Sequence, residues 1–235
     1  MKKGKLYLVP NVIAEGTHTA TIPAQVLVAL PTIHHFLAED VRTARRYLSS
    51  LKIYASIEAL HLEVLNKETP EEKLPELLKP IEAGHHLGII SESGCPGVAD
   101  PGALAVRYAH ENNIQVVPLV GPSSLLLALM ASGLNGQQFA FHGYLPIEAN
   151  EAAKKIKELE QESKTKNQTQ IFIETPYRNN SVFDHFLKNL HSNTRLSVAV
   201  DLTGPGESVR TLPVGEWKKQ KENWPKAPAV FLFLA

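Results

Sequence analysis

The sequence predicts an α/β protein of two domains, a parallel sheet with flanking helices followed by an α+β domain with a mixed sheet. Strands and helices alternate through the first half of the chain, which is typical of a parallel sheet. The strand cores LYLV, LGII and VVPLV are apolar throughout, as expected for strands covered on both faces. Beyond residue 120 strands and helices mix without strict alternation. We therefore expect an N-terminal domain over 1–118 and a C-terminal domain over 119–235.

The N-terminal domain is expected to contain five strands with helices between them. The strands are predicted over 5–9, 35–38, 60–65, 86–90 and 115–120. The helices are predicted over 21–30, 40–51, 70–83 and 103–112, and Gly84 is expected to end the third.

The C-terminal domain is expected to open with a capped apolar helix. Ser123 is a good N-cap residue for a helix over 124–132, which Gly133 would close. Strands are predicted over 139–141, 170–174, 195–202 and 229–234, helices over 148–163 and 181–190, and a solvated loop over 164–168.

The composition limits the classes of function. The chain of 235 residues carries 24 basic and 24 acidic side chains. This balance disfavours a dedicated nucleic-acid-binding protein, which depends on binding many phosphate groups. No apolar run is long enough for a membrane helix, and the apolar stretch before Pro10 is too short for a signal peptide. The single cysteine, Cys95, excludes an intramolecular disulfide. We expect a cytoplasmic enzyme.

The segment Ser91–Gly102 is the most informative part of the sequence. It follows a predicted parallel strand, at the edge where open α/β sheets bind their ligands. Its three glycines and two prolines indicate a rigid loop whose amides can approach a ligand, rather than a plain connection. It matches neither the G-x-G-x-x-G dinucleotide pattern nor a Walker loop.

Several motifs occur in an order that resembles a known group of enzymes. They read LYLVP, AEDVRTARRYL, SESGCPGVADPG, VVPLVGPSS, FHGYLP and IETPYR. In this order, from Leu6 to about Glu207, the chain resembles the tetrapyrrole (corrin/porphyrin) methylase superfamily. Its closest branch looks like the small-subunit ribosomal RNA 2′-O-methyltransferase I group. The resemblance implies two α/β domains, S-adenosylmethionine bound in the cleft between them, and a homodimer.

The resemblance also implies a set of donor-binding residues. The family's donor loop matches Gly94, Cys95, Pro96 and Val98, and Pro10 is kept after the first strand. Ser124 and Leu125 match positions that contact the methionine part of the donor. The family's adenosine-binding region matches Thr175, Leu202, Pro228 and Ala229. Cys95 replaces an aspartate found in many relatives, and a small apolar residue is favoured there over a nucleophile.

The acceptor side is expected to involve charged residues. Glu39, Asp40 and Glu92 are candidate catalytic bases, and Arg42 matches a substrate-side position. Asp40 could equally cap the following helix, with Arg42 on its solvated side. Arg178, in ETPYR, could bind an anionic substrate or tie the second domain together, and the second role is favoured. No metal site is expected, because the pairs His34–His35 and His85–His86 lack metal-ligand spacing.

The identity of the methyl acceptor stays open at this point. The family places basic residues after Tyr144-Leu145-Pro146 where this chain has Ile147-Glu148, and Gly204 replaces a lysine. The three hypotheses are an RNA 2′-O-methyltransferase relative, a methylase of a tetrapyrrole or other small anionic acceptor, and a protein that binds the donor without catalysis.

Overall fold

The computed structural model describes residues 3–235, which fold into two compact units. The first unit ends at Ser123 and the second begins at Ser124, whereas the sequence placed the boundary after residue 118.

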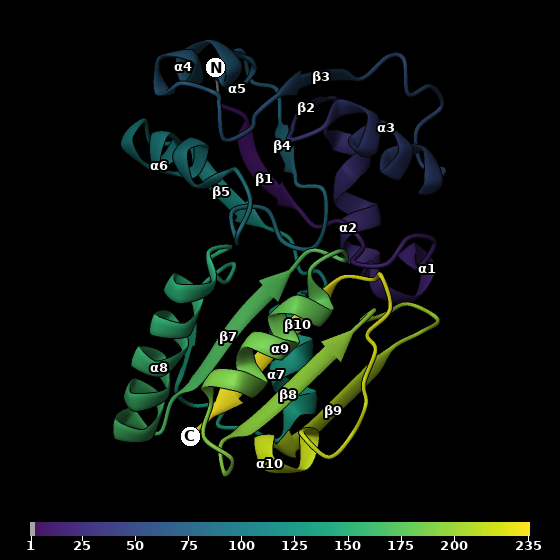
Figure 1. Ribbon diagram of the computed structural model, residues 1–235. Helices are drawn as coiled ribbons and strands as arrows, with labels where there is room; N and C mark the ends of the chain where they lie inside the picture. The colour runs from purple at the N-terminus through teal and green to yellow at the C-terminus, as the bar shows by residue number, and fades with distance from the viewer. Residues whose placement is uncertain (1–2) are drawn as a thin grey trace. The chain divides into compact units, whose positions relative to one another are not determined.

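A parallel sheet of five strands forms the centre of the first unit (Figure 1). The strands are β1 (Lys5–Val9), β2 (His35–Ala38), β3 (His61–Val64), β4 (Leu87–Ile90) and β5 (Gln115–Pro118). Their order is β3-β2-β4-β1-β5, and every neighbouring pair is parallel. The predicted parallel sheet is confirmed.

Helices cover both faces of this sheet because successive strand side chains point to opposite faces. Val9, Phe36 and Ile90 pack in one core cluster, which also holds side chains of α2 (Ala24–Ala29) and α3 (Val41–Ser50). Leu6, Leu37 and Ile89 pack in the other, with α4 (Leu74–Leu77), α5 (Lys79–Glu82) and α6 (Ala103–Glu111). This double burial explains why the strands contain uninterrupted apolar residues.

Two predicted helices of the first unit are divided. The segment 70–83 forms the 3-10 turn η2 (Glu71–Lys73) followed by α4 and α5, with Pro75 and Pro80 each in a first helical turn. Proline lacks the N–H that would continue a helix but is tolerated in a first turn, so each new helix has its proline there. The segment 21–30 was also wrong as one helix, because α1 (His18–Thr21) ends before Pro23 and the 3-10 turn η1 (Leu30–Thr32) follows α2.

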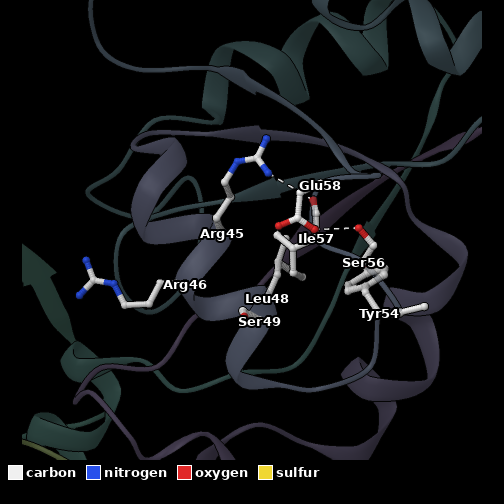
Figure 2. A pocket seen from close by; sticks show the side chains of 9 residues that line it. Arg45, Arg46, Leu48, Ser49, Tyr54, Ser56, Ile57 and Glu58 are labelled. Carbon is white, nitrogen blue, oxygen red and sulfur yellow. Dashed lines mark hydrogen bonds between the residues drawn. The ribbon is translucent and has the colours of Figure 1, made fainter.

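Helix α3 presents arginines to a surface cavity of about 500 Å³ near its C-terminal end. Figure 2 shows Arg45 and Arg46 projecting from the helix, with Arg45 Nη1 donating a hydrogen bond to the Ile57 carbonyl at 3.2 Å. None of the residues predicted to bind donor or substrate lines this cavity.

The second unit contains the predicted mixed sheet, which is confirmed. Its strands are β6 (Phe139–Phe141), β7 (Thr169–Glu174), β8 (Arg195–Val200), β9 (Ser208–Pro213) and β10 (Ala229–Leu234). The order is β6-β7-β10-β8-β9, in which β6 and β7 are parallel and the other pairs are antiparallel. Helices α8 (Ala149–Lys166) and α9 (Asn179–Asn189) pack in one core cluster with Trp217, and α7 (Ser124–Ser132) packs in another.

Two features of the second unit differ from the sequence prediction. The loop predicted over 164–168 was wrong, since α8 continues to Lys166 and ends at Asn167 in the left-handed conformation (φ 50°). Strand β9 and the short helix α10 (Val214–Trp217) were not predicted. The strand sequence SVRTLP has no apolar run, and it is held by pairing with β8 along its whole length.

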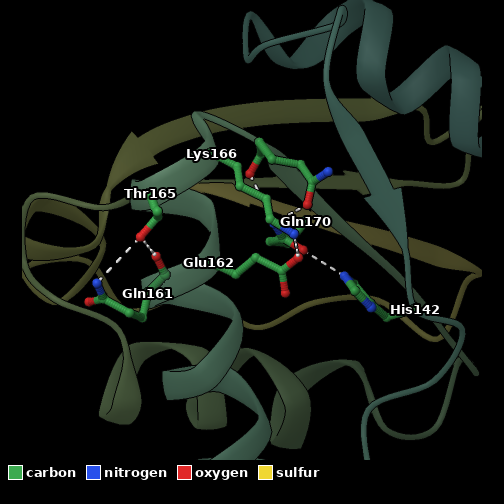
Figure 3. A network of polar contacts seen from close by, with 7 residues as sticks. His142, Gln161, Glu162, Thr165, Lys166 and Gln170 are labelled. Carbon is green, nitrogen blue, oxygen red and sulfur yellow. Dashed lines mark hydrogen bonds and ion pairs between the residues drawn. The ribbon is translucent and has the colours of Figure 1, made fainter.

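Polar side chains of α8 lie beside His142 and the first residues of β7 in the second unit (Figure 3). Figure 3 shows His142 directed toward Gln170, with 2.6 Å between Nε2 and Oε1, and the Lys166–Glu162 ion pair beside them. Burial lowers the pKa of His142. The contact with His142 satisfies the buried amide of Gln170, which also donates to the Gln168 carbonyl.

Histidines gather at the amino edge of the first sheet, opposite the edge that carries Ser91–Gly102. The His35 ring stacks on His61 at 4.8 Å between centroids and lies 5.1 Å from His85. Burial, followed by the charges of His61 and His85, lowers the pKa of His35. The folded protein therefore binds fewer protons than the unfolded chain between this lowered pKa and the ordinary value of about 6.5.

We predict that acidification below about pH 6.5 destabilises the protein partly through His35. His35→Gln removes this group, so the free energy of unfolding should fall less steeply with decreasing pH than in the wild type. Urea denaturation at a series of pH values measures this slope, with the exposed His110→Gln as the matched control. Identical slopes for His35→Gln and the wild type would contradict the prediction.

Candidate functional site

Loops after three neighbouring strands converge at the carboxyl edge of the first sheet. The backbone N–H of Asn11, after β1, donates to the Gly94 carbonyl, after β4, at 2.8 Å. The loop after β5 packs against the loop after β1, because a Cβ atom added at Gly121 would overlap the ring of Pro10. The Cys95 thiol donates to the Pro122 carbonyl at 3.4 Å. Parallel strands end at the same edge, so their connections meet here.

The side chain of Asn11 holds this junction together. It is 2% exposed, and its Nδ2 donates to the carbonyls of Ser91 and Glu92, both at 3.0 Å. Its Oδ1 accepts from the Val12 amide at 2.8 Å. Sequence reasoning missed this residue, although a polar amide directly after a buried strand was the available signal.

The Ser91–Gly102 loop has an unusual backbone. Gly94, Gly97 and Gly102 have φ values of 65°, 81° and 137°, which only glycine adopts readily. Ala99 also has a positive φ of 65°, a conformation that costs free energy for a residue with a Cβ. The side chain of Val98 is 49% exposed and available for an apolar contact.

Three carboxyl groups influence one another at this edge. Burial raises the pKa of Glu39, and the charges of Asp100 and Glu92 raise it further, while a hydrogen bond from the Glu92 backbone lowers it. Burial likewise raises the pKa of Asp100. The Oε2 atom of Glu39 is buried without a hydrogen-bond partner. Glu39 is thus a carboxyl group with one unoccupied acceptor position at the site.

Cys95, Asp40 and Arg42 have more ordinary surroundings. Burial raises the pKa of the Cys95 thiol, which disfavours the thiolate that a nucleophile requires. Asp40 caps α3, since its Oδ1 accepts from the Thr43 amide at 2.7 Å and this bond lowers its pKa. Arg42 is exposed on the first turn of α3.

A cavity of about 340 Å³ adjoins the carboxyl edge within the first unit. Asn11, Val12, Tyr47, Arg46 and Glu92 are among the residues that line it. The Tyr47 hydroxyl donates to the Pro10 carbonyl at 2.8 Å, and this bond fixes the loop after β1 against α3. The cavity thus offers apolar, cationic and anionic groups next to Glu92.

In the second unit, the residues predicted to bind the adenosine lie at one end of the central strands β7, β10 and β8. Ala229 pairs with Glu174 and with Val200, so the segments at 175, 202 and 228 lie close together. The Asp201 amide donates to the Pro228 carbonyl at 3.0 Å. The side chains of Leu202 and Ala229 are buried in core clusters, so neither side chain is available to a ligand. Ser124 and Leu125, half-buried, begin α7.

Arg178 ties loops of the second unit together. Its Nη1 lies 3.4 Å from Oε2 of the buried Glu174, and its Nη2 donates to the carbonyls of Leu145 and Pro146 at 3.3 and 3.4 Å. Glu174 Oε1 accepts from both the amide and the hydroxyl of the exposed Thr175. These contacts hold the segments at 145–146 and 174–178 together.

Residues 3–235 contain neither a candidate metal cluster nor a candidate membrane-spanning helix. No group of three or more histidine, cysteine, aspartate or glutamate side chains is arranged to hold a metal ion. Over the same residues no helix has the length and apolar character needed to cross a membrane.

Comparison with solved structures identifies the class of fold. Uroporphyrin-III-C-methyltransferase from Thermus thermophilus aligns over 100% of this chain and 93% of its own, with a TM-score of 0.57 and 19% identity. The methyltransferase CobJ aligns over 97% and 93%, with a TM-score of 0.63 and 15% identity. The fold is therefore that of the tetrapyrrole methylases.

Curated relatives identify the family more narrowly, although no family model matches the chain. Ribosomal RNA small subunit methyltransferase I of Escherichia coli O157:H7 is 31% identical over 98% of this chain and 77% of its own length. The protein of the same name from Vibrio cholerae is 28% identical over 97% and 76%. The protein is a methyltransferase. It belongs to the ribosomal RNA small subunit methyltransferase I family.

We predict that Asn11→Ala destabilises the protein by about 1–3 kcal/mol, because it leaves the carbonyls of Ser91 and Glu92 without their donor. Urea denaturation measures the loss. Asn189→Ala, which removes one bond to the His185 carbonyl at a helix end, is the matched control and should cost less. A loss for Asn11→Ala no greater than that of the control would show that the junction does not depend on this amide.

Proposed function

We propose that the protein transfers a methyl group from S-adenosylmethionine to a ribose hydroxyl of small-subunit ribosomal RNA. The relatives' shared name supports the acceptor. The observation that carries the chemistry is Glu39, whose buried Oε2 has no partner and whose raised pKa suits a group that takes up a proton.

The residues at the carboxyl edge of the first sheet fit a cationic donor. Burial and then the charges of Asp100 and Glu92 raise the pKa of Glu39, and burial and the charge of Glu92 raise the pKa of Asp100. A sulfonium cation beside these carboxyl groups would relieve the repulsion between them. The glycine amides of the Ser91–Gly102 loop and the half-exposed Val98 supply polar and apolar contacts. We assign Pro10, Gly94, Cys95, Pro96 and Val98 to donor binding in the first unit.

The second unit is proposed to contribute the remainder of the donor site. Thr175, Pro228 and the backbone of Leu202 and Ala229 lie at one edge of its sheet, and Ser124 and Leu125 begin its first helix. The cleft expected between the two domains, the homodimer and the cytoplasmic location stay predictions.

The chemistry requires the chain to position two reactants and to move one proton. When bound, S-adenosylmethionine supplies a methyl group on a sulfonium, and the sulfur keeps the electron pair of the broken bond. The acceptor oxygen forms the new bond to carbon and must lose its proton. Glu39, as the carboxylate, accepts that proton at Oε2, while the rigid loops around Asn11 hold the reactants in line.

We predict that calorimetry detects one donor site for S-adenosylmethionine per chain, and that a tritiated-methyl assay labels deproteinised small-subunit RNA. Tetrapyrrole precursors form the second arm of the assay. Labelling of a tetrapyrrole instead of RNA would replace the proposed acceptor and keep the donor. Absence of binding at millimolar donor would overturn both.

The pH dependence of the rate tests Glu39. The carboxyl group must be ionised to accept a proton, and its pKa is raised, so kcat/KM should rise with pH along a limb above the usual glutamate value of about 4.3. Glu39→Gln should lower kcat by about 100-fold or more and remove this limb. The exposed Glu63→Gln is the matched control. A Glu39→Gln enzyme with the wild-type profile would exclude Glu39 as the base.

A further inference from the structure

An exposed aromatic ring with a cation over its face lies at one edge of the second unit. Tyr177 is 83% exposed, and the ammonium of Lys226 lies 5.6 Å from the centroid of its ring. A single exposed ring is common on protein surfaces, and it indicates a binding surface where further apolar groups adjoin it.

The surrounding hydrogen bonds hold this pair in place. Tyr177 sits in a turn closed by the Arg178 amide, which donates to the Thr175 carbonyl at 3.1 Å. The buried Asn179 donates to the carbonyls of Pro225 and Ala227 at 3.0 and 2.8 Å, on both sides of Lys226. Both side chains thus extend from anchored backbone, which reduces the entropy lost when a ligand is bound.

Further exposed apolar surface borders the turn. Arg178 Nη2 binds the carbonyls of Leu145 and Pro146 and so holds that segment against the turn. The residues on either side of the segment, Tyr144 and Ile147, are 55% and 83% exposed. The nearby carboxylate of Glu148 is occupied in capping α8.

We propose that Tyr177 and Lys226 form a stacking platform for a base of single-stranded RNA, with the Lys226 ammonium contacting the adjacent phosphate. Aromatic rings bind unpaired bases by stacking, and a neighbouring cation binds the backbone that connects them. The inference rests on the proposed function and names a part of the chain that would hold the acceptor. Thr175 and Pro228 each lie two residues from the platform, so the platform adjoins the residues assigned to the donor.

Binding of a fluorescein-labelled single-stranded oligoribonucleotide, followed by anisotropy over a series of salt concentrations, separates the two contributions. Tyr177→Ala should weaken binding by about 5- to 100-fold and leave the salt dependence unchanged. Tyr177→Phe keeps the ring and should bind as the wild type does. Lys226→Ala should reduce the slope of log K against log salt by about 0.7.

The matched control is Lys219→Ala, an exposed cation two residues beyond α10. Helix α10 lies at the end of the sheet opposite the end of β7 that precedes Tyr177 (Figure 1). The salt slope of Lys219→Ala should equal that of the wild type. Calorimetry with S-adenosylmethionine and thermal unfolding check that each variant keeps its fold and its donor site.

Three results would overturn the platform: wild-type affinity in Tyr177→Ala, equal losses in Tyr177→Phe and Tyr177→Ala, or no oligoribonucleotide binding by the wild-type protein. The tritiated-methyl assay tests the proposed methylation of RNA independently of the platform. If the wild type methylates RNA while Tyr177→Ala binds RNA normally, the platform fails and the function stands.

Discussion

The candidate site in the first unit depends on the hydrogen bonds of one buried amide side chain. Ser91 and Glu92 directly follow Ile90, the last paired residue of β4, and a buried carbonyl without a donor costs free energy. Asn11 donates to the carbonyls of Ser91 and Glu92 and accepts from the next amide along its own loop. Aspartate could not donate to the carbonyls, and leucine could neither donate nor accept. The position of the Ser91–Gly102 loop, and so of Gly94 and Glu92, follows from this junction.

The same edge concentrates acidic groups where solvent is partly excluded. Glu39 follows β2 while Glu92 and Asp100 follow β4, and these two strands are neighbours in the sheet. Their repulsion is a property of the fold, because parallel pairing brings the ends of β2 and β4 to one place. Like charges at this distance disfavour the ionised carboxylates, and a cation beside them favours ionisation. The retained repulsion and the unpaired Glu39 oxygen are what a site for a positively charged reactant requires.

Sequence reasoning identified strands marked by an apolar run and missed a strand held by pairing alone. The apolar cores of β1, β4 and β10 predict buried strands directly. In contrast, β9 has no apolar period, and its partner β8 determines its conformation. For the site, the glycine loop and Glu39 could be found because glycine and acidic residues after strands are visible in the sequence. Asn11 acts through contacts to residues about 80 positions away, and Tyr177 through a segment near 226, so neither role can be read from local sequence.

The zero net charge of the chain argues against a protein that binds RNA mainly through long-range attraction, and the proposed acceptor must be reconciled with it. Stacking on Tyr177 requires no net charge, and a single cation such as Lys226 can neutralise a phosphate locally. Arg178, the most obvious cation of the second unit for an anionic substrate, is instead occupied by Glu174 and two carbonyl groups. Binding of this kind draws on aromatic surface and few phosphates, so it is weakly dependent on salt. It also favours unpaired RNA over duplex, because only unpaired bases can leave their own stack to lie on a protein ring.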